Sequence, residues 1–271
     1  MEKKARTRFI VLWLLIAALL LAGSLLSPSA ERENVQTAMK DAVLHEENRI
    51  LLFPGFDVAP GLVSSIVITC LLLLGALLIR LFAIPRFREI PGKGQLLLET
   101  AVSCFDGLAA SASPYRNRFL GAYAFSAGSY VFLSTLFELF GFQAVTAAGR
   151  SVALPAPLSD INGAISLGVM SYLVIVSGGA AGAGLKGVGR ALKDFSLPLS
   201  MSFRLFGALL SGLLVTELVY HYTALSFVLP VIVAVMFTLM HALIQAYVLT
   251  MLTTMFYGEA AEPLPKKIKK A

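Results

Sequence analysis

The chain is built around apolar blocks that are each long enough to cross a lipid bilayer. A membrane-spanning helix needs about 20 consecutive apolar residues, and blocks of that length recur along the sequence. They show no alternation of apolar and polar residues, so the pattern favours spanning helices over the strands of a β-barrel. Charged residues make up 14% of the chain, against roughly 25% in a soluble domain. We therefore predict an all-α polytopic membrane protein.

Six blocks are predicted to form spans, and they divide the chain into two parts. Residues 1–57 hold one extra span and an extracytoplasmic segment, whereas residues 58–271 hold the other five spans. The predicted spans are 9–27, 58–83, 119–140, 161–181, 197–220 and 229–257.

The first block has two readings. It follows the basic residues of the N-terminus, as the apolar region of a cleavable signal peptide does. It is longer than such a region usually is, and it lacks a clear Ala-x-Ala cleavage site. These two features favour an uncleaved span.

The distribution of Lys and Arg predicts the orientation of the chain. With the N-terminus inside, most of the basic residues fall in inner segments, as the positive-inside rule requires. The formal net charge of +6 is thereby explained without nucleic acid as a partner. If the first span is retained, both termini are cytoplasmic. The basic residues left outside are Arg32, Lys40, Arg49 and Arg150.

One connecting segment, 94–112, is predicted to form an amphipathic helix. Its polar residues Gln95, Glu99, Ser103 and Asp106 recur every three or four positions. This spacing is typical of a helix that lies along the inner membrane surface. The alternative is a helix that packs on other spans.

Arg204 lies inside the predicted span 197–220, and of all residues it most limits the functions that the chain can have. Its guanidinium stays charged at physiological pH, and a charge at that depth is costly, so such residues are usually functional. Pairing with a carboxylate of this chain, or reaching for the inner interface, are the alternatives. Apart from Met201, the residues on its helix face are small, which suits the close approach of a partner helix: Ser200, Gly207, Ala208 and Ser211.

The last span carries a polar stripe formed by Thr238, His241 and Gln245. Histidine gains and loses a proton near neutral pH, and glutamine binds neighbours without carrying charge. Hydrogen bonding between helices is the alternative role. Glu138 and Glu217 lie near the outer ends of their spans, where each would line a water-filled path or sit solvated at the interface.

Three segments of the chain resemble subunit a of the membrane sector of F-type ATP synthases, of the bacterial type. Residues 202–207 (SFRLFG) look like the central arginine motif of that family. Residues 245–253 (QAYVLTMLT) look like its last-helix motif, and residues 90–99 (IPGKGQLLLE) resemble the segment before its surface helix. Pro155, Asp160 and Asn162 fit a weaker mid-chain pattern, although Asp160 is also a plausible N-cap. The resemblance covers about residues 58–260.

This resemblance implies the stator of a rotary ATP synthase in the bacterial plasma membrane. The last two spans would be long and packed against a ring of c subunits, with Gln245 beside Arg204. Arg204 would keep each ring carboxylate ionised, so that a proton cannot pass it. Two half-channels would couple proton or sodium flow to ATP synthesis. The resemblance also implies b-type peripheral stalk subunits and the lipid bilayer as partners, with no cofactor and no catalysis by this subunit alone.

The chain departs from the family pattern at three positions. Ala208, Leu213 and Thr238 stand where many members carry Asn, Glu or His, and His or Glu. Glu217 lies one helical turn beyond Leu213, and His241 lies one turn beyond Thr238. We therefore hypothesise a relocated proton relay through these two residues. The predicted ion pathway comprises Gln245, His241, Glu217, Glu138, Thr238 and Ser211.

Two other classes of function compete with this one. A secondary transporter would use Arg204 to bind an anionic substrate, but the sequence shows no internal repeat and no paired broken helices. A membrane-embedded enzyme would need a nucleophile motif or a metal site. The three histidines, His45, His221 and His241, show no metal-ligand spacing.

Overall fold

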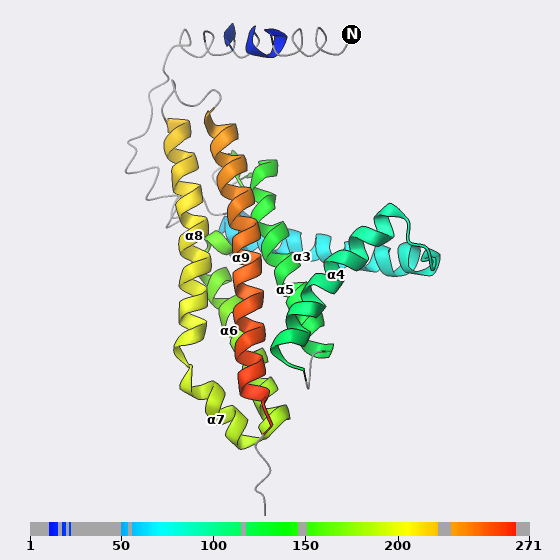
Figure 1. Cartoon of the computed structure of the whole chain (residues 1–271). Coiled ribbons are helices and arrows are strands. Elements are labelled where there is room, and N and C mark those ends of the chain that lie inside the picture. The colour runs from blue at the N-terminus through cyan, green and yellow to red at the C-terminus, as the bar shows by residue number, and fades with distance from the viewer. Residues whose placement is uncertain are drawn as a thin grey trace, which may run out of the picture.

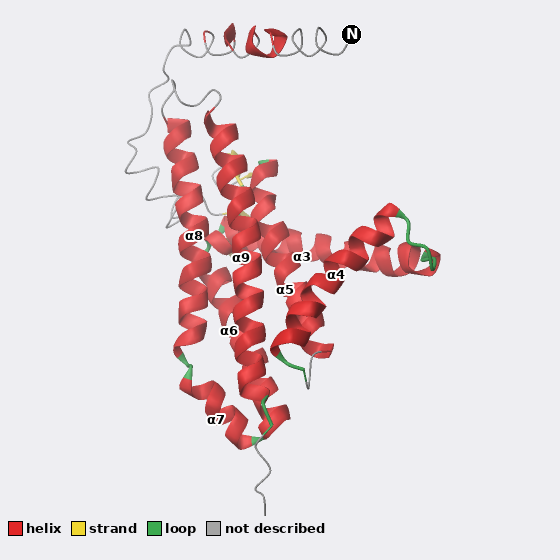
Figure 2. Cartoon of the chain, viewed as in Figure 1, coloured by secondary structure: helices red, strands yellow, loops and turns green. Residues whose placement is uncertain are grey.

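The computed structural model describes residues 11–15, 18–19, 22, 50–53, 56–114, 118–145, 151–221 and 229–263. Helices make up most of the described chain, as Figures 1 and 2 show. The all-α polytopic class predicted from the sequence is therefore confirmed. The elements are β1 (Ile50–Phe53), β2 (Phe56–Val58), α3 (Pro60–Leu78), η1 (Ile79–Ala83), η2 (Ile84–Arg86), α4 (Lys93–Ala112), α5 (Arg118–Phe137), η3 (Glu138–Phe140), β3 (Gln143–Val145), β4 (Ser151–Ala153), η4 (Pro157–Ser159), α6 (Ile161–Ala183), α7 (Leu185–Lys193), α8 (Ser196–His221) and α9 (Leu229–Ala261).

Five described helices are long and apolar enough to cross a membrane. They correspond to the last five predicted spans. The predicted span 9–27 falls mostly outside the described residues, so a sixth span stays a prediction. The five candidate spans are Pro60–Arg86, Phe119–Phe140, Ile161–Ala183, Ser196–Val215 and Val235–Ala261.

Four of these helices form the body of the molecule. α6 packs against α8 and α9, and α9 also packs against α5. α8 and α9 lie side by side, while α3 runs across their direction in Figure 1. α3 is the least covered span, since only 11% of its most apolar window is buried. The core that joins the body includes Leu120, Val131, Ile175, Leu205 and Leu249.

The amphipathic helix predicted at 94–112 is α4, and its two halves differ. In the first half, Gln95 folds the preceding loop back, because its Oε1 accepts from Arg88 N at 3.0 Å and its Nε2 donates to Arg88 O at 2.9 Å. In the second half, Phe105 meets Phe125 of α5 edge to face at 5.8 Å, and Ala109 is fully buried. The alternative of packing on another span thus applies to the second half.

Two features of the fold were not predicted. Two short antiparallel hairpins, β1–β2 and β3–β4, lie outside the spanning helices. Their strands have three or four residues, which is too short for a pattern in the sequence. The second feature is α7, which follows α6 directly because Gly184, at φ +62°, ends that helix in a conformation suited to glycine.

Candidate functional site

Arg204 is an exposed residue of α8, beside the contact of α8 with α9. The adjacent face of α8 carries Met201, Leu205 and Leu209, and these side chains pack into the core. The small residues predicted around Arg204 are in the open: Ser200, Gly207 and Ser211 are exposed, and Ala208 is partly buried. A methyl group added to Gly207 would meet no atom within 4 Å. The strip is therefore a shallow, uncovered surface, which we call the α8 strip.

Arg204 and Gln245 line one small gap between α8 and α9. The other residues around the gap are apolar: Met201, Leu205, Val248, Leu249 and Leu252. Among the described side chains, no carboxylate forms an ion pair with Arg204. The predicted alternative of an internal ion pair thus finds no support in the part of the chain that the structure describes.

The buried face of α9 explains why Gln245 points to this gap. Gln245 is only 6% exposed and belongs to a row of small or polar side chains spaced by three and four residues. The threonines in this row are satisfied within the helix, because Thr250 and Thr253 each donate to a carbonyl one turn back at 2.8 Å. The row consists of Thr238, Ala242, Gln245, Ala246, Thr250 and Thr253.

His241 is held in one defined tautomer. Its Nδ1 lies 2.7 Å from the carbonyl oxygen of Phe237, and its ring stacks on the Phe237 ring with centroids 5.8 Å apart. A carbonyl can only accept a hydrogen bond, so Nδ1 carries the hydrogen. In the neutral ring, Nε2 is then the nitrogen that carries no hydrogen.

The structure gives less detail on the other residues that were predicted to form the ion pathway. The side chain of Glu217 lies outside the described residues. Glu138 is half-buried on η3, and η3 contacts α9. Ser211 is exposed and donates to Ala208 O at 2.7 Å, and Thr238 is 8% exposed. Within the described ranges, no group of three or more His, Cys, Asp or Glu residues is placed to hold a metal ion.

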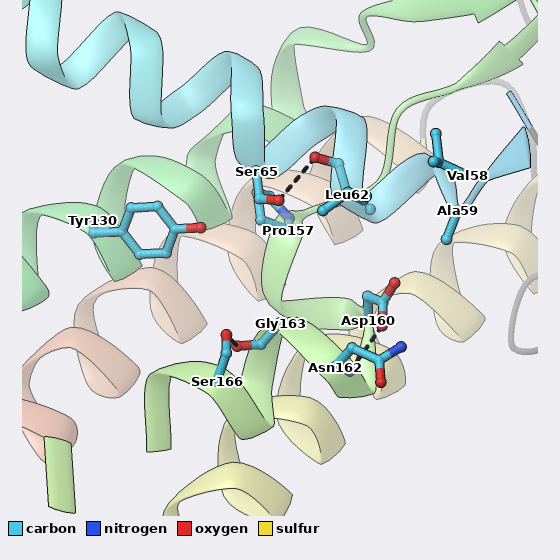
Figure 3. Close-up of a pocket in the computed structure, with 11 residues that line it drawn as sticks. Val58, Ala59, Leu62, Ser65, Tyr130, Pro157, Asp160, Asn162, Gly163 and Ser166 are labelled. Carbon is cyan, nitrogen blue, oxygen red and sulfur yellow. Dashed lines mark hydrogen bonds between the residues drawn. The ribbon is translucent and has the colours of Figure 1, made fainter. Parts of the chain in front are cut away.

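A cavity that the sequence did not reveal, lined by both apolar and polar side chains, lies at the predicted outer ends of α3 and α6. It measures about 430 Å³, and Figure 3 shows Tyr130 and Ser65 on one side of it and Asp160, Asn162 and Ser166 on the other. Asp160 accepts from Asn162 N at 2.8 Å, which is the N-cap contact considered from the sequence. The cavity draws on three segments far apart in the chain, so no local pattern marked it.

A second buried contact joins α5 to α6. The hydroxyl of Tyr123 lies 2.8 Å from Ser171 Oγ, and Ser171 itself donates to Leu167 O at 2.9 Å. Tyr123 is therefore the donor in this pair. The bond ties two spans together inside the bundle, where an interhelical hydrogen bond avoids an unsatisfied polar group.

Comparisons with known proteins agree with these features. A family model described as ATP synthase A chain matches residues 63–258, a range that contains both Arg204 and Gln245. The chain is also 32% identical over 121 residues to "ATP synthase subunit a, chloroplastic" of Bigelowiella natans. That alignment covers 40% of this chain and 48% of the relative, so the chain spans about half the length of the curated relative.

Proposed function

Since the chain belongs to the ATP synthase A chain family, we propose that it is the ion-translocating stator subunit of a rotary ATP synthase. It is a component of that complex and is not catalytic by itself. It is a multi-pass membrane protein. We also propose that the membrane is the bacterial plasma membrane and that both termini are cytoplasmic. Protons or sodium ions that pass the subunit drive rotation and thereby ATP synthesis.

The exposed guanidinium of Arg204 on the α8 strip carries this proposal. Small side chains around it let a helix of a c-subunit ring approach closely. A carboxylate on that helix would meet a fixed cation, which lowers the pKa of the carboxyl and keeps it ionised. An ion bound to the carboxylate must then leave before the carboxylate passes Arg204, so ions cannot leak across the site.

Gln245 serves the same step as a neutral neighbour. Its amide can donate and accept hydrogen bonds without cancelling the charge of Arg204. The apolar residues around their shared gap keep water away, which strengthens the interaction between Arg204 and the ring carboxylate.

Two half-channels supply and remove the ion on either side of Arg204. Outside, the cavity between α3 and α6 gives water access. The path from there toward Arg204 is formed by Glu138, Glu217, Thr238, His241 and Ser211. The Nε2 atom of His241 suits this role because it can exchange a proton. The b-type peripheral stalk subunits hold the chain still against the rotating ring.

The direct test replaces Arg204 with alanine in membrane vesicles that contain the whole complex. We expect Arg204→Ala to abolish ATP-driven ion pumping while the complex still assembles, because the side chain is exposed and is not part of the core. Ser200→Ala, on the same exposed strip, is the matched control and should pump normally. Normal pumping by Arg204→Ala would overturn the proposal.

A further inference from the structure

The inner end of α9 cannot cap itself. The last four carbonyl groups of a helix have no partner within the helix, and a cation near them is favourable. α9 has no basic residue in its last turn, and two acidic residues, Glu259 and Glu262, stand there instead. Negative charge at this end of a helix is unfavourable, so the end of α9 needs a cation from elsewhere.

Arg190 of α7 supplies that cation. Its Nη1 donates to Glu259 O and to Glu262 O, each at 3.0 Å. Both acceptors are main-chain carbonyls, so one guanidinium satisfies an open carbonyl in the last turn of α9 and the carbonyl just beyond its end. A hydrogen bond from a charged donor is stronger than one between neutral groups.

The helix that carries Arg190 is itself fixed to the bundle. Tyr172 of α6 donates its hydroxyl hydrogen to Ala191 O at 3.1 Å. Gly187 lies so close to α6 and α9 that a methyl group on it would overlap the backbones of Gly179 and Ala260. α7 is thus a rigid platform on α6, and Arg190 ties the end of α9 to that platform.

We infer that Arg190 is a positioning residue that holds α9 in the rotation that keeps Gln245 beside Arg204. Successive residues of a helix are about 100° apart, so a small rotation of α9 would turn Gln245 away from the gap. The expected effect of Arg190 on ion pumping rests on the proposed function, whereas the contact of Arg190 with α9 does not depend on that function. No ion passes over Arg190 itself.

The test compares Arg190→Ala and Arg190→Lys in the whole complex, with Lys193→Ala as a control on the exposed side of α7. Hydrogen exchange of the last-turn amides of α9 is measured together with ATP-driven pumping per assembled complex. Loss of a charge-assisted bond should speed exchange by about tenfold in the alanine variant. Pumping should fall several-fold, and lysine should restore part of both values, because an ammonium group can still donate to these carbonyls.

Two outcomes would overturn the inference. One is unchanged exchange in Arg190→Ala, which would show that the end of α9 is held without the guanidinium. The other is faster exchange with normal pumping per complex, which would give Arg190 a role in the helix end alone. Exchange does not depend on ion flow, so a failure of the proposed function, seen as normal pumping in Arg204→Ala, is told apart from a failure of this inference.

Discussion

At the scale of single residues, we propose that Arg204 contributes a charge and Gln245 a neutral amide to the same step. Arg204 is exposed on α8, and Gln245 is buried on α9 at the gap the two share. A carboxylate in place of Gln245 would lie in a mostly apolar environment next to the guanidinium. There the two opposite charges would attract each other strongly, which is the reason a neutral amide suits this position.

The variant Gln245→Glu tests that reasoning. The new carboxylate would pair with Arg204 and compete with the ring carboxylate, so we expect pumping to fall by about tenfold or more. ATP-driven acidification of vesicles, normalised to the amount of assembled complex, measures the effect. Thr250→Val is the matched control, because Thr250 is buried on the same face of α9 and its hydroxyl bonds only within that helix. Pumping by Gln245→Glu equal to that of the control would contradict the assigned role.

At the scale of elements, α8 has two faces with different partners. One face packs Met201, Leu205 and Leu209 into the core, whereas the other leaves the α8 strip open. Helices in a membrane gain little from apolarity alone, because lipid is equally apolar, and they associate where small side chains allow close packing. We therefore predict that the open strip is a surface for another chain.

The variant Gly207→Leu fills this strip without disturbing the fold. A side chain there meets no atom of this chain within 4 Å, so we expect normal insertion and stability of the isolated subunit. The close approach of a ring helix should be blocked, and pumping should drop at least several-fold. Gly75→Leu on α3 is the control, since that position is equally open but lies away from α8. Co-purification of the ring with each variant measures docking, and equal yields for both would refute the strip as the docking surface.

At the scale of the whole molecule, the crossed directions of α3 and α9 limit how the chain sits in a bilayer. α9 has 33 residues, which at about 1.5 Å each is about 50 Å, more than the roughly 30 Å of a hydrocarbon core. α3 is the most apolar span, with mean hydropathy 2.8, and it runs across the direction of α8 and α9 in Figure 1. Both directions cannot follow the membrane normal at once. Because α3 is the most apolar of these spans, we predict that α3 stands upright and that α8 and α9 lie obliquely.

Depth measurements with spin labels test this arrangement. Labels at the exposed residues Met236 and Tyr247 of α9 are separated by about 16 Å along the helix, and Ile66 and Leu77 of α3 are equally far apart. We expect the α3 pair to differ in depth by nearly the full rise. The α9 pair should differ by less than about half of that rise if α9 lies obliquely. A full difference in depth across the α9 pair would contradict the tilt.

The sequence by itself determined the fold class, and it singled out Arg204 as the residue on which the proposed function rests. Whether a block spans a membrane depends on its own length and apolarity. The local hydropathy of the sequence was therefore sufficient to predict the bounds of five helices within a few residues. The cost of a charge in a bilayer singled out Arg204, and the helical period placed Thr238, His241 and Gln245 on one stripe. The resemblance to a family added Gln245 as the neighbour of Arg204.

Only the tertiary structure decided how these helices meet. The cavity around Asp160, the pair of Tyr123 with Ser171 and the contact of Arg190 with the end of α9 each join segments that are distant in the sequence. A local sequence pattern does not tell which face of an apolar helix meets protein and which meets lipid, since both surroundings are apolar. Which face is covered depends on the fit of small side chains and on a few long-range hydrogen bonds, and these are properties of the packed molecule.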